Sequence, residues 1–340
     1  LSLLLISPSF TIQNDSEDDL PVYLKGIGWR DVEAELRKDL RLSNSIRPTR
    51  YEVRLNVSVR GYEGAEKSTF RGSVFILLNV SSPIDIIELH SVDLAIEKAR
   101  ILAVGEEVLS TGEVKYHPER ETISIPSKRM IQKDEIVLLQ IFYNGIVQMN
   151  GAGLYESWTT REDSNDPETP TISLVTSGEP TGARLWIPCF DEPDKKATFT
   201  LVVHHPKELS VYSNSFIQRS QSDRFSRKVT FFKRTNPLPT YLFALAVTKQ
   251  KVATTDKYVK RHRQFRAIGK NKKSAIIEFI SAFNAINSIK VFENVTYFPE
   301  KNDIIIVDDY PERSAMENPG LITAGRKAAL EFDTLLHEIA

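Results

Sequence analysis

The feature that most constrains this chain is a run of short alternating segments with no helical pattern between them. From Tyr51 to Val59, apolar residues at every second position alternate with polar ones such as Glu52 and Arg54. Period-two alternation with β-branched residues is typical of a strand with one buried face. Similar segments follow at 74–80, 84–89, 136–143, 198–203, 229–232 and 241–247. Strands without intervening helices predict a β-sandwich or saddle over residues 41–248.

The pattern changes after residue 248. Helical spacing relates five apolar residues, which are Ile276, Phe279, Ile280, Phe283 and Ile286. This spacing predicts an amphipathic helix over 274–291, with Ser274 as its N-cap. A buried strand is expected at 304–307 and a second helix at 327–340. Because 340 residues exceed the size of a single core, we expect a mainly β chain that begins a separate α/β domain at residue 249.

Composition limits the chemistry that the chain can perform. It has 44 Lys and Arg against 45 Asp and Glu, for a formal net charge of -1. A nucleic-acid-binding protein should show a basic excess, so we expect no nucleic-acid partner. The single cysteine, Cys189, excludes an internal disulfide framework and a Cys-based zinc cluster. A metal site must therefore draw on the six histidines and on carboxylates.

The N-terminal residues leave the cellular location open. The apolar run Leu3–Ile6 is far shorter than the roughly 20 residues that span a bilayer. It fits the last piece of a signal or anchor and a frayed terminus equally well. Four glycosylation sequons, against roughly two expected by chance, begin at Asn14, Asn56, Asn79 and Asn294. They slightly favour an extracellular or plasma-membrane surface location over the cytoplasm, with membrane association through a missing N-terminal anchor left open.

The pair His337-Glu338 lies on the second expected helix. In HExxH zinc sites the two His lie one turn apart and face the metal, and the Glu takes a proton from zinc-bound water. The second His would be residue 341, which this sequence does not contain. Taken alone, the pair is explained as well by an exposed helix end.

Two longer stretches change that interpretation. They are YPERSAMENPGLIT at 310–323 and RLWIPCFDEPDKKATFTL at 184–201. With RPTRYEVRLNV, LHSVDLAIEKARI and TNPLPTYLFALAV in the same order, they resemble the aminopeptidase N family of zinc aminopeptidases, of the gluzincin type. The resemblance runs from about Ile46 to the end. It implies a flexible lead over 1–40, the family's β domain over 41–248, and the incomplete start of a thermolysin-like catalytic domain over 249–340, truncated within HExxH.

The resemblance also implies roles for particular residues. Zinc is the cofactor of the family, and a peptide with a free N-terminus is the partner. Carboxylates suit this partner because they stabilise an ammonium group and not an amide. The implied roles are a zinc ligand at His337, a catalytic base at Glu338, amine contacts at Glu317 and Glu179, and backbone pairing with substrate at Ser314, Ala315 and Met316. Asp191 and Glu192 of the PCFDEP stretch are interpreted as structural.

Several departures from the family pattern argue against activity. Ser314 replaces the Gly of GAMEN, Pro319 replaces the usual Trp, and Ala324 replaces the usual Tyr. Only 20 positions separate Glu317 from His337, fewer than in the family. The second zinc His, the third ligand Glu and the later catalytic Tyr are absent, whereas a catalytic zinc needs three protein ligands. We therefore expect this chain as it stands to bind no zinc and to hydrolyse nothing.

Two functions stay open. One is the N-terminal part of a zinc metallo-aminopeptidase that removes N-terminal amino acids from peptides. The other is a non-catalytic peptide- or partner-binding module derived from such an enzyme.

Overall fold

The computed structural model describes residues 40–103, 108–149, 151–159, 171–250, 252–254, 264–269, 272–288, 301–308, 310 and 314–339. The chain divides into two compact units, residues 1–42 and 43–340. The sheets of the described residues all lie in the second unit. The predicted flexible lead over 1–40 lies, apart from its last residue, outside the described residues.

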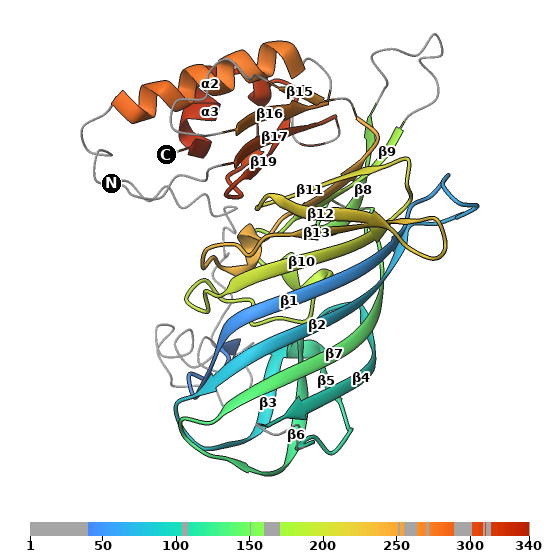
Figure 1. The fold of residues 1–340 in the computed structure, drawn as a ribbon. Helices are drawn as coiled ribbons and strands as arrows, with labels where there is room; N and C mark the ends of the chain where they lie inside the picture. The colour runs from blue at the N-terminus through green and yellow to red at the C-terminus, as the bar shows by residue number, and fades with distance from the viewer. Residues whose placement is uncertain are drawn as a thin grey trace, which may run out of the picture. The chain divides into compact units, whose positions relative to one another are not determined.

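The largest sheet has seven strands (Figure 1). Their order across the sheet is β12 (Ile217–Ser222), β13 (Lys228–Phe232), β10 (Thr198–His205), β1 (Ile46–Ser58), β2 (Thr69–Val80), β7 (Ile136–Ile146) and β4 (Leu94–Leu102). β1 and β10 run parallel, and the other neighbours are antiparallel. The strand β1 is therefore the central strand of this sheet. The burial of its side chains shows which face of the sheet is covered by the rest of the protein.

The alternation seen in the sequence predicts the buried face of β1 correctly. The apolar residues from Tyr51 to Val59 are each at most 1% exposed, whereas Arg54 and Asn56 between them are exposed. The Tyr51 ring stacks on Phe199 of β10 at a centroid distance of 4.6 Å. Each such buried side chain contributes about 1.5–3 kcal/mol relative to an exposed one, so register and face are fixed together.

Two smaller sheets complete the β region. A three-stranded sheet has the order β3 (Ile84–His90), β6 (Thr122–Ile131) and β5 (Lys115–His117). A four-stranded sheet has the order β11 (Ser210–Ser213), β14 (Leu245–Thr248), β9 (Thr171–Ser177) and β8 (Gly153–Thr159). The expected strand 241–247 is wrong in its first half, because residues Thr240–Leu242 form a 3₁₀ turn.

A five-stranded mixed sheet follows, with the order β15 (Val252–Thr254), β16 (Gln264–Ile268), β17 (Lys301–Val307), β19 (Leu321–Gly325) and β18 (Ala315–Met316). The helices α2 (Lys272–Ser288) and α3 (Phe332–Ile339) pack on one face against residues such as Ile304 and Ile306. On the other face Ile305 and Val307 pack against Tyr212 and Ala246 of the four-stranded sheet. Burial on both faces explains why β17 is a continuous apolar run.

Both helices differ from their predicted bounds. α2 begins at Lys272, so Ser274 lies in its first turn and is not its N-cap. The second helix starts later than expected, because a 3₁₀ turn at Ala328–Leu330 precedes α3. The prediction of a mainly β chain is confirmed, while the domain boundary at residue 248 stays a prediction. Among the described residues, no helix combines the length and apolar character that crossing a membrane requires.

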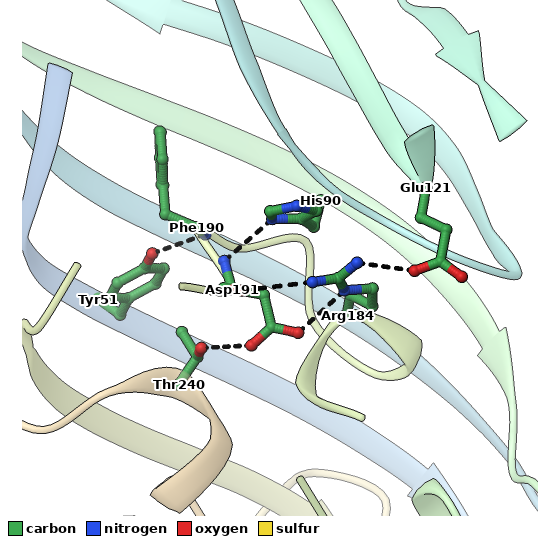
Figure 2. A network of polar contacts seen from close by, with 7 residues as sticks. All are labelled: Tyr51, His90, Glu121, Arg184, Phe190, Asp191 and Thr240. Carbon is green, nitrogen blue, oxygen red and sulfur yellow. Dashed lines mark hydrogen bonds and ion pairs between the residues drawn. The ribbon is translucent and has the colours of Figure 1, made fainter. Parts of the chain in front are cut away.

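A buried polar network holds the PCFDEP turn in place (Figure 2). The Asp191 carboxylate accepts hydrogen bonds from Arg184 Nε at 3.0 Å and from the Thr240 hydroxyl at 2.5 Å. Arg184 also donates to Glu121 at 2.7 Å. The Asp191 side chain is only 1% exposed, so these bonds replace the water that it loses on folding.

Two side chains satisfy the backbone of the same turn. The Phe190 N–H donates to the Tyr51 hydroxyl at 3.1 Å, and the Asp191 N–H donates to His90 Nδ1 at 3.2 Å. An accepting Nδ1 requires a neutral imidazole. Burial, followed by the positive charges of Arg184 and Arg120, lowers the pKa of His90 to about 3. Asp191 thus joins segments that are distant in the sequence, which agrees with its interpretation as a structural residue.

We predict that Arg184→Met lowers the free energy of unfolding by about 3–5 kcal/mol, because it leaves the Asp191 carboxylate buried without its cation. Urea unfolding followed by circular dichroism measures this loss. The matched control is Arg54→Met, which removes an exposed arginine paired with Glu52 and should cost less than about 1 kcal/mol. Equal losses in the two variants would contradict the prediction.

Candidate functional site

Three carboxylates that the sequence pointed to come together from separate segments. Glu179 follows β9, Glu317 follows β18, and Glu338 lies on α3. Partial burial, followed by the charge of Glu317, raises the pKa of Glu179. Burial, followed by the charges of Glu317 and Glu179, raises the pKa of Glu338 to about 7. Mutual repulsion of this kind makes the site favour a cation.

The three carboxylates are open to a ligand. Glu179 and Glu317 are exposed, and Glu338 is half-buried. Within the part of the chain that the structure describes, no arginine or lysine forms an ion pair with any of them. Among the described residues, the cluster therefore offers negative charge without a paired arginine or lysine.

Two tyrosines lie beside the carboxylates. Burial, then the charges of Glu338, Glu179 and Glu317, raise the pKa of Tyr310 to about 12. Burial and the charges of Glu317 and Glu179 also raise the pKa of Tyr241. Both hydroxyls are therefore protonated at neutral pH and can donate or accept hydrogen bonds. Sequence reasoning missed both tyrosines, although each lies in a stretch that carried the family resemblance.

Gly178 explains why Glu179 and Tyr241 are neighbours. A Cβ atom at Gly178 would lie only 2.2 Å from the Tyr241 carbonyl oxygen. A residue without a side chain thus lets the turn after β9 lie directly against the 3₁₀ turn that contains Tyr241. This close contact between the two turns brings Glu179 near Tyr241, whose pKa the charge of Glu179 helps to raise.

The strand before Glu317 lies at a sheet edge. β18 pairs with β19 only, with Ala315 opposite Ala324 and Met316 opposite Thr323. The Ser314 carbonyl accepts from the Gly325 N–H at 3.0 Å on the same side. The opposite edge of β18 has no partner strand among the described residues, so its backbone groups can pair with an added extended peptide.

The turn after Glu317 is fixed to the four-stranded sheet by Asn214. Its side-chain nitrogen donates to the Pro319 carbonyl at 3.0 Å and to the Leu242 carbonyl at 2.8 Å. Its side-chain oxygen accepts from the Ala244 N–H at 2.8 Å. One buried amide thus holds the segment after Glu317 and the segment after Tyr241 at a fixed separation.

Lys301 supplies a second anchor for the same turn. Its ammonium group donates to the carbonyls of Ser213 and Gly320 and lies 2.8 Å from Asp303 Oδ2. Lys301 is 2% exposed, and Asp303 is also paired with Arg266 at 2.5 Å. A buried charge is tolerated only with such partners. The contact of Lys301 with the Gly320 carbonyl therefore fixes Gly320 relative to β17.

The described residues do not fit a zinc ion. They contain no group of three or more His, Cys, Asp or Glu side chains that could hold a metal. His337 is exposed, and its neighbour Glu338 is half-buried. The structure brings together Glu179, Glu317 and Glu338, and His337 directly precedes Glu338 on α3.

Comparison with protein families matches residues 47–242 to the Peptidase M1 N-terminal domain. Because this match covers more than half of the chain, the chain belongs to that family. The resemblance to aminopeptidases found in the sequence is thereby confirmed at the level of the family, and the parts that the site residues play stay predictions.

The curated relatives are aminopeptidases. Aminopeptidase N from Haemonchus contortus is 29% identical over 302 residues, which cover 87% of this chain and 30% of that protein. Glutamyl aminopeptidase from Rattus norvegicus is 29% identical over 320 residues, covering 90% of this chain and 31% of that protein. Aminopeptidase 2, mitochondrial, from Saccharomyces cerevisiae is 29% identical over 284 residues, which cover 83% of this chain and 28% of that protein. The chain spans about 30% of the length of the relatives it matches.

We predict that Gly320→Ala destabilises the protein more than Gly64→Ala does. Both glycines have left-handed backbones, with φ of 80° and 77°, which alanine adopts at a cost of about 1–2 kcal/mol. A Cβ at Gly320 would lie 2.1 Å from the Asn214 carbonyl oxygen, while nothing lies within 4 Å of one at Gly64.

The clash should add about 1–3 kcal/mol for Gly320→Ala alone, as measured by urea unfolding of both variants. Equal losses would mean that the turn after Glu317 is not held tightly against Asn214.

Proposed function

We propose that the chain is the N-terminal part of a zinc metallo-aminopeptidase that removes N-terminal amino acids from peptides. Its own share of that task is to bind the free amino end of the substrate. The observation that supports this is the convergence of Glu179, Glu317 and Glu338, each from a different segment, without a cation among the described residues. The relatives are named as aminopeptidases, which agrees with the proposal.

An α-ammonium group fits this cluster chemically. It carries one positive charge and three donors, and carboxylates accept charge-assisted hydrogen bonds from it. An internal peptide nitrogen carries no charge and a single donor, so it leaves the repulsion between the carboxylates uncompensated. The difference in free energy between these two cases would restrict binding to peptide ends.

The remaining roles follow from the order of the site along β18. The backbone of Ser314, Ala315 and Met316 would pair with the substrate as an added strand, which sets the direction of the peptide. Glu317, directly after this strand, and Glu179 would hold the amine at its end. The hydroxyls of Tyr241 and Tyr310 can donate to these carboxylates and keep them oriented.

Zinc belongs to the family that the chain resembles, where a bound zinc ion supplies an activated water. His337 would be a ligand and Glu338 the base. The donor set of the described residues does not complete such a site.

A second candidate function is a non-catalytic peptide- or partner-binding module. The observation that favours it is internal to the sequence: Pro319 replaces the usual Trp, and only 20 positions connect Glu317 to His337. Both candidates use the same carboxylates for binding, and they differ in turnover.

We predict that the 340-residue chain binds leucinamide at pH 7 and that Glu317→Gln weakens this binding about tenfold or more. Hydrogen bonds to a charged group contribute about 1.5–3 kcal/mol each, and the substitution removes the charge while keeping the shape. Calorimetric or NMR titration measures the affinity. Glu179→Gln should act in the same direction, whereas Glu119→Gln, at an exposed carboxylate in the 3₁₀ turn Pro118–Arg120, should have no effect.

N-acetyl-leucinamide separates amine recognition from side-chain binding. It keeps the side chain and loses the ammonium group, so it should not bind detectably. Equal binding of the acetylated and free ligands would contradict the proposal for Glu179 and Glu317.

We further predict that the purified 340-residue chain does not hydrolyse aminoacyl-arylamides when zinc is added. His337 is its single candidate ligand in the HE pair, and catalytic zinc needs three protein ligands. Release of the arylamine, followed by absorbance with and without a chelator, checks this. Chelator-sensitive turnover would show that these residues complete a metal site and would exclude the non-catalytic alternative.

A further inference from the structure

A cleft of about 580 Å³, lined by both polar and apolar residues, lies on the exposed face of the seven-stranded sheet, away from the carboxylate cluster. It extends over the adjacent ends of β1, β2, β7 and β4. Its lining includes the side chains of Asn56, Ser58, Thr69, Arg71 and Asn144. Amides, hydroxyls and a guanidinium group are the groups that pair with the hydroxyls of a sugar.

The cleft contains a glycosylation sequon. Asn56 and Ser58 are the first and third residues of Asn-Val-Ser. Because side chains two positions apart on a strand point to the same side, the acceptor amide and the hydroxyl that the sequon requires both face the cleft. This coincidence of a motif and a cavity comes from two independent observations.

Arg227 fixes the orientation of the Asn56 amide. Its guanidinium group donates to Asn56 Oδ1 and, at 2.6 Å, to the Val57 carbonyl oxygen. Arg227 is held in turn by Glu63, 2.9 Å from its Nε. With the oxygen of the amide directed to Arg227, the nitrogen Nδ2 is directed away from it. Nδ2 is the atom to which an N-linked sugar is attached.

We propose that Asn56 accepts an N-linked glycan and that the first sugar of this glycan lies in the cleft. The co-reactant is a lipid-pyrophosphate-linked oligosaccharide of the secretory pathway. A bond forms between Asn56 Nδ2 and the anomeric carbon of the sugar, while the bond from that carbon to the pyrophosphate oxygen breaks. The lipid pyrophosphate leaves with the electron pair, and the proton lost by Nδ2 goes to solvent.

Asn79 provides an internal comparison. It is also an exposed sequon residue on the same sheet, near the end of β2, where its neighbours in register are Arg47 and Ile136. It does not line the cleft. A glycan on Asn79 would therefore project into solvent, whereas one on Asn56 would begin between side chains.

The first experiment tests whether Asn56 is an acceptor. The full chain, preceded by a cleavable secretory signal, is translated with endoplasmic-reticulum membranes, and the protease-protected fraction is analysed by gel mobility. Asn14, Asn79 and Asn294 are changed to Gln, which leaves Asn56 as the one sequon. We expect the mobility shift of one oligosaccharide, reversed by an endoglycosidase and abolished by Ser58→Ala. An unshifted protected chain would overturn the proposal.

The second experiment tests whether the cleft holds the sugar. Chains glycosylated at Asn56 alone and at Asn79 alone are digested with a peptide N-glycosidase, folded and after denaturation. Release from Asn56 should be about tenfold slower than from Asn79 in the folded protein, because the linkage must first leave the cleft, and equally fast after denaturation. Equal rates in the folded state would overturn the placement of the sugar.

Discussion

The arrangement of the site depends on the contacts of the buried Lys301 ammonium group. Buried at the start of β17, it joins Asp303 of its own strand to the carbonyls of Ser213 and Gly320. Removing it would leave a buried carboxylate and two carbonyls to be satisfied, which is costly in a dry interior. Because Gly320 lies three residues after Glu317, this contact and that of Asn214 hold the turn that follows Glu317.

How much of the fold can be predicted depends on how local its cause is. The alternation around Val53 and Leu55 predicts β1 because a half-covered sheet face dictates the pattern directly. The prediction of a strand from Tyr241 is wrong in its first half, because the apolar residues there form a 3₁₀ turn beside Gly178 before β14 begins. A run of apolar residues predicts that a segment is buried, but it does not predict whether the buried segment is a strand or a turn.

The candidate site shows the same division. Glu179, Glu317 and Glu338 were found through the resemblance of whole stretches, because nothing local distinguishes them from other glutamates. Tyr241 and Tyr310 were missed, and Asn214 and Lys301 give no signal in the sequence, since their function arises from contacts across 19 to 105 positions. Only the pairing of distant strands brings Asn214 and Lys301 to the backbone groups that they hold.

Recognition of an amine and activation of water have different structural requirements. A cluster of carboxylates needs only the two turns after β9 and β18 to be held together, which Asn214 and Gly178 achieve through the β sheets. A zinc site needs three ligands converging within the reach of one ion. The first requirement can therefore be met by a fold that does not meet the second. If the carboxylates bind free amino ends as proposed, loss of metal chemistry would leave that binding intact, because the contacts of Asn214 and Gly178 among the described residues do not involve His337.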